Sequence, residues 1–377
     1  MEGLDMRQQI EIKEARPLLD SEGNLTQKGY ARSLLPVYDR SMVKGGKTRL
    51  KEWDYYYIGN DSYGVALTIA DNSYMGLDSF SFLYFGDEVS SYRRSAKTAV
   101  PKSATSVCGS AWEITKSPMR VFPMGKTGLP ETSAEGITSI SGKHYFLVFR
   151  VADGKRKLTG HIDKFRGRDA LDVDITLISE PAESMVICTP FDKKAHFYFN
   201  QKINCMPAQG YVKIGSDVFE FKPEDSMGLL DWGRGVWTYH NTWYWGSASG
   251  YVNGEPFGFN IGYGFGDTSA ASENMLFYRG KSHKISEVSF NIPMKPDEKG
   301  NLTEDYMSPW TFTSDDGSFE MTFKPVLDRA SDTDVKLIRS NQHQVFGAFS
   351  GEARLEDGTV IEIKDFRGFA EKVENKW

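Results

Sequence analysis

The chain has 377 residues and a formal net charge of −6, so it is long enough for about two domains and gives nucleic-acid binding little electrostatic support. No run reaches the ~18 apolar residues of a membrane-spanning helix, so we expect no integral membrane segment. The N-terminal MEGLDMRQQIEIKEAR lacks the apolar segment of a secretory signal. The three cysteines, Cys108, Cys188 and Cys205, are widely spaced, which favours reduced thiols and a cytoplasmic location.

The first half of the chain is predicted to form an extended arm followed by strands. Residues 1–50 contain turn signals such as Glu22-Gly23-Asn24, and they are expected to form the N-terminal arm. From residue 51 to about residue 205, short runs rich in aromatic and β-branched residues predict strands. Asp153-Gly154 is a two-residue hairpin signal. The run LDVDITLI alternates, which places on one face Leu171, Val173, Ile175 and Leu177.

The second half, residues 206–377, repeats this succession of short strands and turns, with a boundary expected near Pro207 and Gly210. The final FRGFAEKVENKW is predicted to be one short helix, with Phe366, Phe369 and Val373 on one face. Many antiparallel strands joined by hairpins predict an all-β fold of barrels or sandwiches.

A stretch rich in aromatic residues, Leu229–Asn274, is the centre of the functional prediction. Four of the eight tryptophans fall within fourteen residues, at Trp232, Trp237, Trp243 and Trp245. Large aromatic side chains build an apolar wall, and ionisable groups set into such a wall have shifted pKa values. This composition fits a ligand pocket, but a packed aromatic core with polar residues at turns fits it equally well.

The polar residues of the stretch are the candidate site residues. Asp231 and Arg234 are expected to pair in a glycine-rich turn, which is either part of the site or a structural clamp on the loop. A carboxylate between Leu230 and Trp232 is costly to desolvate, so Asp231 needs a partner or a function. His240 is either a proton carrier or a hydrogen-bonded structural residue. Further candidates that line the pocket or tie down strand ends are Asn260, Asp267, Glu273 and Asn274.

Several cofactor and catalytic motifs lack their required spacing. Residues 262–266 have GxGxG spacing, whereas a dinucleotide site needs GxGxxG between a strand and a helix. Ala248 stands where a nucleophile elbow needs serine. The chain has no CxxC and no pair of histidines at ligand spacing, so no metal site is expected. We therefore expect an activity that uses no cofactor.

Several segments resemble the bacterial family called domain of unknown function 2804. They are DWGRGVW, WYWGSASG, GFNIGYGFGD and the SEN that follows, together with LLDSEGNL, EWDYYYI and FAEKVENKW. The resemblance covers nearly the whole chain.

More distantly, the chain is similar to the double-lipocalin group, which includes carotenoid 1,2-hydratase, tocopherol cyclase and Diels–Alder cyclases. This similarity implies two lipocalin-like antiparallel barrels of the calycin type, packed together. It also implies an Asp and a His among aromatic walls as proton donor and cation stabiliser. Asp231 and His240 are the nearest matches here, although Asp precedes Trp in this chain and Arg234 stands where a His or Asp is expected.

These observations predict a hydratase, isomerase or cyclase that acts on a hydrophobic small molecule. A protonated Asp231 would donate the proton, and the tryptophans would stabilise developing positive charge. The alternatives are a non-catalytic lipocalin-like carrier of a lipid or pigment, and an aromatic seam between domains with no pocket. The sequence leaves the oligomeric state open.

Overall fold

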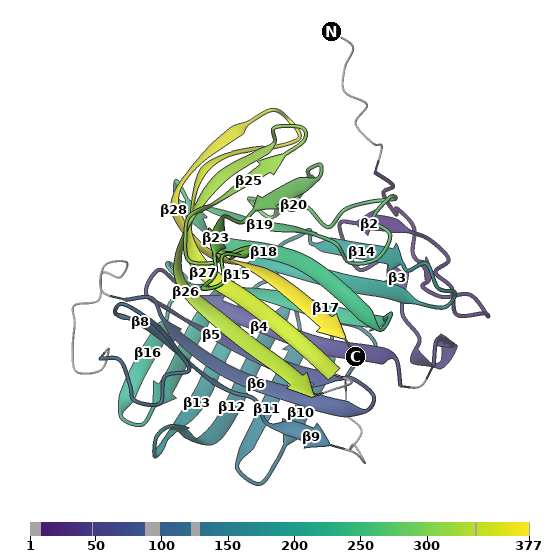
Figure 1. The fold of residues 1–377 in the computed structure, drawn as a ribbon. Helices are drawn as coiled ribbons and strands as arrows, with labels where there is room; N and C mark the ends of the chain where they lie inside the picture. The colour runs from purple at the N-terminus through teal and green to yellow at the C-terminus, as the bar shows by residue number, and fades with distance from the viewer. Residues whose placement is uncertain (1–8, 47, 87–98, 122–128, 336–337, 377) are drawn as a thin grey trace.

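A computed structural model describes residues 9–46, 48–86, 99–121, 129–335 and 338–376. Nearly all regular structure is β-strand, and Figure 1 shows the strands gathered into two large curled sheets. The predicted all-β fold is confirmed, and the two antiparallel barrels that the sequence led us to expect take the form of two curled antiparallel sheets. Within the described residues, no helix is both long and apolar enough to cross a membrane.

The first sheet has fifteen strands, and its main path runs in the order β10-β11-β12-β13-β15-β17-β4-β5-β6-β8-β7. Its strands are β2 (Gly29–Ala31), β4 (Leu50–Gly59), β5 (Tyr63–Asp71), β6 (Met75–Tyr84), β7 (Ser106–Cys108), β8 (Ala111–Lys116), β9 (Met119–Val121), β10 (Gly136–Ser141), β11 (Tyr145–Ala152), β12 (Lys155–Arg166), β13 (Asp169–Leu177), β14 (Met185–Pro190), β15 (Phe197–Ile214), β16 (Asp217–Phe221) and β17 (Met227–Val236).

The second sheet has nine strands in the order β21-β20-β19-β18-β28-β27-β26-β25-β22. They are β18 (His240–Val252), β19 (Glu255–Tyr263), β20 (Met275–Tyr278), β21 (Lys281–Lys284), β22 (Val288–Asn291), β25 (Trp310–Ser314), β26 (Phe319–Val335), β27 (Ile338–Arg354) and β28 (Val360–Lys376). Outside the two sheets lie the pairs β1 (Arg16–Pro17) with β3 (Pro36–Val37) and β23 (Met294–Pro296) with β24 (Leu302–Glu304), and the 3₁₀ turn η1 (Arg40–Met42).

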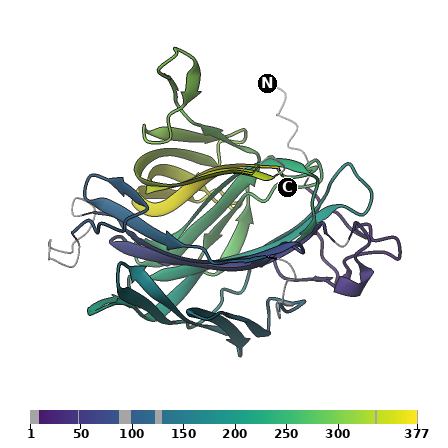
Figure 2. The ribbon, with the colours of Figure 1, turned by 60° about the horizontal axis from the view of Figure 1, so that its bottom comes forward.

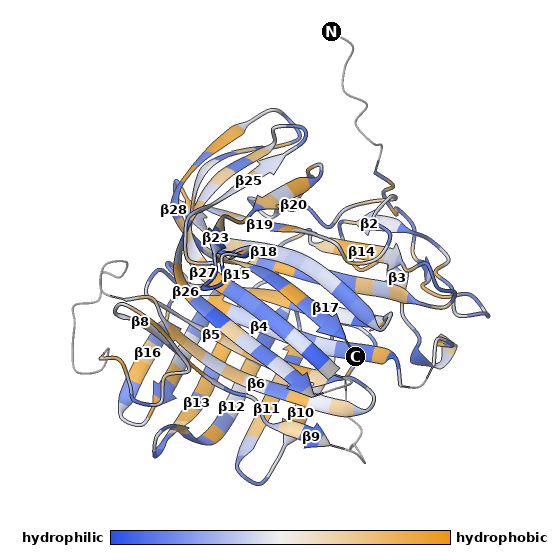
Figure 3. Cartoon of the chain, in the orientation of Figure 1, coloured by the Kyte–Doolittle hydropathy of each residue, from blue (hydrophilic) through white to orange (hydrophobic). Residues whose placement is uncertain are grey.

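Alternating side chains give each curled sheet its own core. Leu171, Val173, Ile175 and Leu177 of β13 are all buried in the first core, as their spacing predicts. Figure 3 shows the same alternation of hydrophobic and hydrophilic residues along β11–β13. The Asp153-Gly154 hairpin is also confirmed, because both residues have positive φ, 52° and 67°, between β11 and β12. This is the twist that a two-residue hairpin requires.

The two sheets pack against each other through a seam (Figure 2). Asn204 of β15 crosses it, because its Nδ2 donates to Ser247 Oγ at 2.8 Å and to the Phe259 carbonyl at 3.2 Å. The N-terminal arm also joins the two halves. β2 pairs with β14 of the first sheet, while Arg32 forms a 2.8 Å ion pair with Glu356, between β27 and β28. Both Asn204 and the N-terminal arm therefore connect the two sheets.

The prediction of a C-terminal helix is wrong, because FRGFAEKVENKW lies in the long strand β28. Backbone pairing with both β18 and β27 decides its conformation, since tertiary context overrides a local helical spacing. The chain passes from the first sheet to the second between Val236, at the end of β17, and His240, at the start of β18. Met206 lies inside β15, and the division of the chain at residues 205/206 stays a prediction.

Gly233 of β17 allows the Trp53 ring to lie directly on the strand. A Cβ at Gly233 would sit 1.9 Å from Trp53 Cζ2, and the ring is held by Tyr198 and Trp237, with centroids 6.3 and 5.3 Å away. We therefore expect Gly233→Ala to lower the free energy of unfolding by about 1–3 kcal/mol through overpacking, measured by urea denaturation. In a Trp53→Ala background the same change should cost little. An equal cost in both backgrounds would refute the clash.

Candidate active site

Successive side chains of strand β17 point alternately to the two faces of the first sheet. Trp232 packs in the first core, and the side chain of Arg234 on the same face is fully buried. Asp231 is buried on the other face, toward the second sheet. The predicted Asp231–Arg234 pair is therefore wrong, because the segment is a strand, not a turn, and residues three apart point to opposite sides of it.

Asp231 pairs with Lys202 of the neighbouring strand β15. Lys202 Nζ lies 3.0 Å from Asp231 Oδ1, and the two side chains are 4% and 11% exposed. Asn200 Nδ2 donates to the same oxygen at 2.6 Å. The Lys202 ammonium also lies over the Trp245 ring of the second sheet, 3.9 Å from its centroid. Lys202 and Asn200 therefore both donate to one oxygen of Asp231, and the contact with Lys202 is a buried ion pair.

Glu371 of β28 brings a second carboxyl to this cluster. Its Oε1 accepts from Trp243 Nε1 and its Oε2 from Gln344 Nε2, both at 2.9 Å. Burial raises the pKa of Glu371 to about 7, while the Trp243 hydrogen bond and the charges of Arg329 and Lys202 oppose the rise. The nearby negative charge of Asp231 adds to it. Glu371 is therefore a carboxyl that changes protonation near neutral pH.

Glu273 supplies a third carboxyl, in the segment that leads from β19 to β20. Burial raises the pKa of Glu273, Lys202 opposes this and Asp231 reinforces it. Asn260 positions the segment, since its Nδ2 donates to the Glu273 carbonyl at 2.8 Å and its Oδ1 accepts from Trp245 Nε1 at 2.7 Å. One lysine thus faces three carboxyl groups, an arrangement that favours holding one of them protonated.

Aromatic rings from both sheets surround the cluster. Trp237 makes edge contacts with Trp53, Trp243 and Phe265, with centroids 5.3, 5.9 and 4.8 Å apart. On the other side Trp245 contacts Tyr55 at 5.8 Å and Phe369 at 4.8 Å. These rings lower the local dielectric, which is why the buried carboxyls have raised pKa values. Three of the four tryptophans singled out in the sequence therefore belong to this wall, and Trp232 does not.

Several polar atoms of the cluster are buried without a hydrogen-bond partner among the described residues. They include Asn200 Oδ1, Trp237 Nε1 and Glu273 Oε2. An unsatisfied buried polar atom costs about 1–3 kcal/mol, so such atoms are rare and call for an explanation. Here two acceptors and one donor border the same aromatic wall, which is the pattern of anchoring groups in a ligand site.

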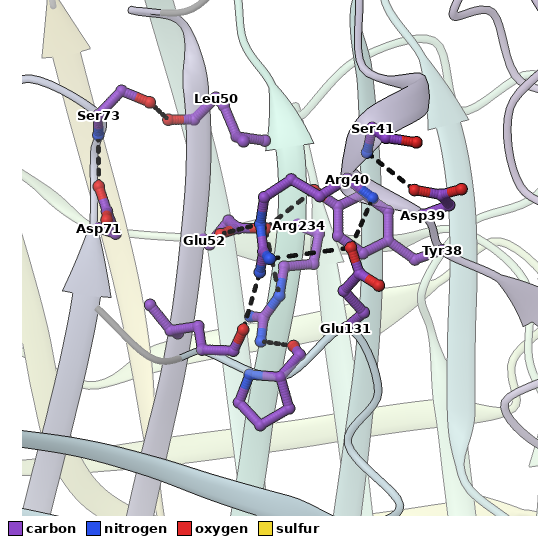
Figure 4. Close-up of polar contacts among 12 residues, drawn as sticks. Tyr38, Asp39, Arg40, Ser41, Leu50, Glu52, Asp71, Ser73, Glu131 and Arg234 are labelled. Carbon is purple, nitrogen blue, oxygen red and sulfur yellow. Dashed lines mark hydrogen bonds and ion pairs between the residues drawn. The ribbon is translucent and has the colours of Figure 1, made fainter. Parts of the chain in front are cut away.

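Arg234 belongs to a separate network on the far side of the first sheet (Figure 4). Both Nη1 and Nη2 lie 3.1 Å from Asp54 Oδ1, and Nη2 also donates to the Pro130 carbonyl at 2.8 Å. Its Nε lies 3.8 Å from Glu52, which also accepts from Arg40 and Tyr38 of the N-terminal arm. Arg234 thus connects the sheet to the arm.

The other predicted residues are divided between the cluster and its surroundings. Asn274 ties strands together, because its Oδ1 accepts from the Gly262 amide at 2.7 Å and its Nδ2 donates to the Ser286 carbonyl at 2.9 Å. Asp267 is exposed and accepts from the Ser269 amide in a turn, which lowers its pKa. His240 is exposed at the start of β18, paired with Lys376. The structure does not bring His240 or Asp267 into the cluster.

Sequence reasoning missed the residues that complete the cluster, chiefly Lys202, Asn200 and Glu371. A signal for the first two exists in FYFNQKINC, where Asn200 and Lys202 share one strand face with Tyr198. A lysine on the face of a strand otherwise rich in aromatic residues is unusual unless it is paired. Glu371 was hidden by the helical interpretation, which separates it from Phe369 and Val373.

The model of a domain of unknown function, DUF2804, matches residues 9–377. The chain belongs to the DUF2804 family. This confirms the resemblance carried by DWGRGVW and its companion segments. No curated protein matches the chain significantly.

Three solved structures are similar in fold to this DUF2804 chain. An AttH-type protein of Nitrosomonas europaea has 10% identity and a TM-score of 0.44, over 90% of this chain and 99% of that one. Kievitone hydratase of Nectria haematococca has 10% identity and a TM-score of 0.42, over 96% and 98%. CghA has 8% identity and a TM-score of 0.37, over 99% and 95%.

Proposed function

We propose that this DUF2804 protein is a cofactor-independent hydratase, isomerase or cyclase that acts on a hydrophobic small molecule at the seam between its sheets. The observation that carries the proposal is the buried cluster of Asp231, Glu273 and Glu371 around Lys202, enclosed by tryptophan and tyrosine rings. Carboxyl groups held in different protonation states by their surroundings are the usual components of acid–base catalysis.

The roles follow from the contacts. Glu371 is the proton donor, because burial raises its pKa to about 7. It gives its proton to an alkene or carbonyl of the substrate, and the face of Trp243 stabilises the positive charge that develops. Asp231, ionised beside Lys202, accepts a proton from attacking water in a hydration, or from the adjacent carbon in an isomerisation or cyclisation. The protons given and taken balance over the cycle.

Asp231 therefore takes a different role from the one its sequence neighbours suggested. Asp231 forms an ion pair with Lys202 at 3.0 Å and accepts from Asn200 at 2.6 Å on the same oxygen, so we propose it as the base and not as the proton donor. Arg234 and His240 take no part in the proposed chemistry, since one faces the opposite side of the sheet and the other is exposed.

Isotopic water distinguishes an enzyme from a carrier. Purified protein is incubated with a panel of apolar alkenes and α,β-unsaturated ketones, in H₂¹⁸O and separately in D₂O. We expect one panel member to gain ¹⁸O if the reaction is hydration, or carbon-bound deuterium if it is isomerisation or cyclisation, read by mass spectrometry. Asp231→Asn should lose this incorporation, because an amide accepts no proton.

Asp174→Asn is the matched control, since Asp174 also pairs with a lysine, Lys157, but on the exposed face of the first sheet. It should incorporate label at the normal rate. A hydrophobic compound that copurifies, is identified by native mass spectrometry and leaves both labelled waters without incorporation would instead establish the carrier function.

A further inference from the structure

One cavity, called the second cavity after the second sheet on which it lies, opens away from the seam. Its volume is about 540 Å³, and it is bounded by strands β26 and β27, the β23–β24 hairpin and the segment that follows this hairpin. Tyr306 joins it to the second core, because its ring lies 6.0 Å from that of Trp310. The lining residues are Lys295, Thr303, Glu304, Asp305, Tyr306, Met307, Asp328, Asn341 and His343.

This cavity and the seam lie on opposite faces of the same sheet. On β27, Gln344 contacts Glu371 at the seam, whereas the neighbouring His343 lines the second cavity. On β28, Glu371 faces the seam, whereas Lys372 donates to Glu304 of the cavity wall at 2.9 Å. A ligand in the second cavity therefore does not occupy the proposed active site.

An aspartate–histidine pair lies in the wall of the cavity. His343 Nδ1 is 2.7 Å from Asp328 Oδ2, and the two side chains are 22% and 18% exposed. The Tyr306 ring stacks flat on the imidazole, with centroids 3.8 Å apart and planes within 9°. The bond to Asp328 directs the proton of a neutral imidazole to Nδ1, so that Nε2 keeps its lone pair as an acceptor.

Two acceptor atoms of this pair, Asp328 Oδ1 and His343 Nε2, have no donor among the described residues. Asp328 Oδ1 is buried without a hydrogen-bond partner, and no described side chain donates to His343 Nε2. The other two carboxylates of the wall each hold a lysine: Lys372 lies 2.9 Å from Glu304 and Lys295 lies 3.0 Å from Asp305. Asp328 is therefore the carboxylate of the wall that no lysine contacts, and its partner is the imidazole of His343.

We propose that this cavity binds a small primary amine in its ammonium form, through the Asp328–His343 pair. An ammonium group has three donors and one positive charge, so it can donate to His343 Nε2 while the Asp328 carboxylate, on the other side of the imidazole, favours the positive charge. The ring of Tyr306 holds the imidazole in place, and Thr303 and Asn341 offer hydrogen bonds to further polar groups of the ligand. The proposal is independent of the activity proposed for the seam.

Histidine NMR tests the assignment directly. The chain has six histidines, so protein labelled with ¹³C,¹⁵N-histidine gives few ring signals, and His343→Ala identifies the signal of His343. We expect n-butylamine to shift this signal in a saturable way. The neutral isostere n-butanol should not shift it at equal concentration. No saturable shift with n-butylamine, or equal shifts with both probes, would overturn the proposal.

Variants separate binding from a general effect of the amine. Asp328→Asn keeps the size of the side chain but removes its charge, and it should weaken n-butylamine binding about tenfold or more, since interactions with a charged group are stronger than those with a neutral amide. Asp163→Asn is the control, because Asp163 pairs with the exposed His144 at 3.0 Å on the first sheet. It should leave the affinity unchanged. Unaltered affinity in Asp328→Asn refutes the role of the pair.

Discussion

Glu371→Gln is expected to reduce turnover by about 10²–10⁴-fold, the usual contribution of a general acid, while the fold stays intact. Gln has nearly the shape of Glu and keeps the oxygen that accepts from Trp243 or Gln344. It has no acidic proton to give. The measurement is kcat/KM on the substrate found with isotopic water, together with circular dichroism of the variant. Turnover within threefold of normal would exclude Glu371 as the acid.

The pH dependence provides a second measurement on the same residue. Because the acid must be protonated and the pKa of Glu371 is raised to about 7, kcat/KM should fall about tenfold for each pH unit above 7. Stability should follow the same group. Its folded-state pKa lies above the ordinary 4.5, so its contribution is fully present below pH 4.5 and is lost as the pH rises to about 7.

Glu371→Gln removes this loss, because an amide stays neutral at every pH. The variant should therefore be at least as stable as the unaltered protein at pH 8, although it is inactive. Glu362→Gln is the control on the same strand, since Glu362 is exposed. It should keep full activity and the original pH profile. A variant of Glu371 that is both inactive and unfolded at pH 8 contradicts the assignment of a raised pKa.

Lys202→Met is expected to lower the free energy of unfolding by about 3–5 kcal/mol, the usual cost of breaking a buried ion pair from one side. The change removes the only cation in direct contact with Asp231 among the described residues and leaves the Asp231 carboxylate buried beside two other carboxyls. Met fills the volume of the lysine stem and still packs on Trp245. Urea denaturation followed by tryptophan fluorescence measures the loss.

Two further variants show whether charge is the cause. Lys202→Met combined with Asp231→Asn leaves no unpaired charge, so it should be more stable than Lys202→Met alone. Lys157→Met breaks an exposed pair with Asp174 and should cost no more than about 1 kcal/mol. If the double variant is as unstable as the sum of its single changes, the loss comes from packing and not from the charge on Asp231.

The sequence predicted the parts of the site that are local. The clustered tryptophans correctly predicted an aromatic wall, and Trp237, Trp243 and Trp245 belong to it. The alternation of apolar and polar residues correctly placed Leu171 and Val173 in a core, because the two faces of a strand can be read from its own sequence. The same alternation, applied to DWGRG as a strand, separates Asp231 from Arg234. The turn interpretation failed because glycine here makes room for Trp53 and does not bend the chain.

The partners of Asp231 were not predictable from its neighbours in the sequence. Lys202 and Glu371 come from different sheets and Glu273 from the segment between β19 and β20, so only the tertiary fold brings them together. Charged residues crowd the segment 362–376 on both sides of Glu371, so neither its composition nor a helical spacing sets that carboxyl apart. What identifies it is burial, which depends on the second sheet lying on the first.

The pairing of β27 with β28 carries a further consequence. It contains a bulge between Phe349 and Gly351, where Gly351 has φ of 150° and a Cβ would lie 2.1 Å from the Glu320 carbonyl oxygen. A slip of β28 by one position would exchange Glu371 with Lys372 between the faces of the sheet. This bulge at Gly351, eight residues from His343 and twenty from Glu371, therefore helps to set which charged side chain each face of the sheet presents.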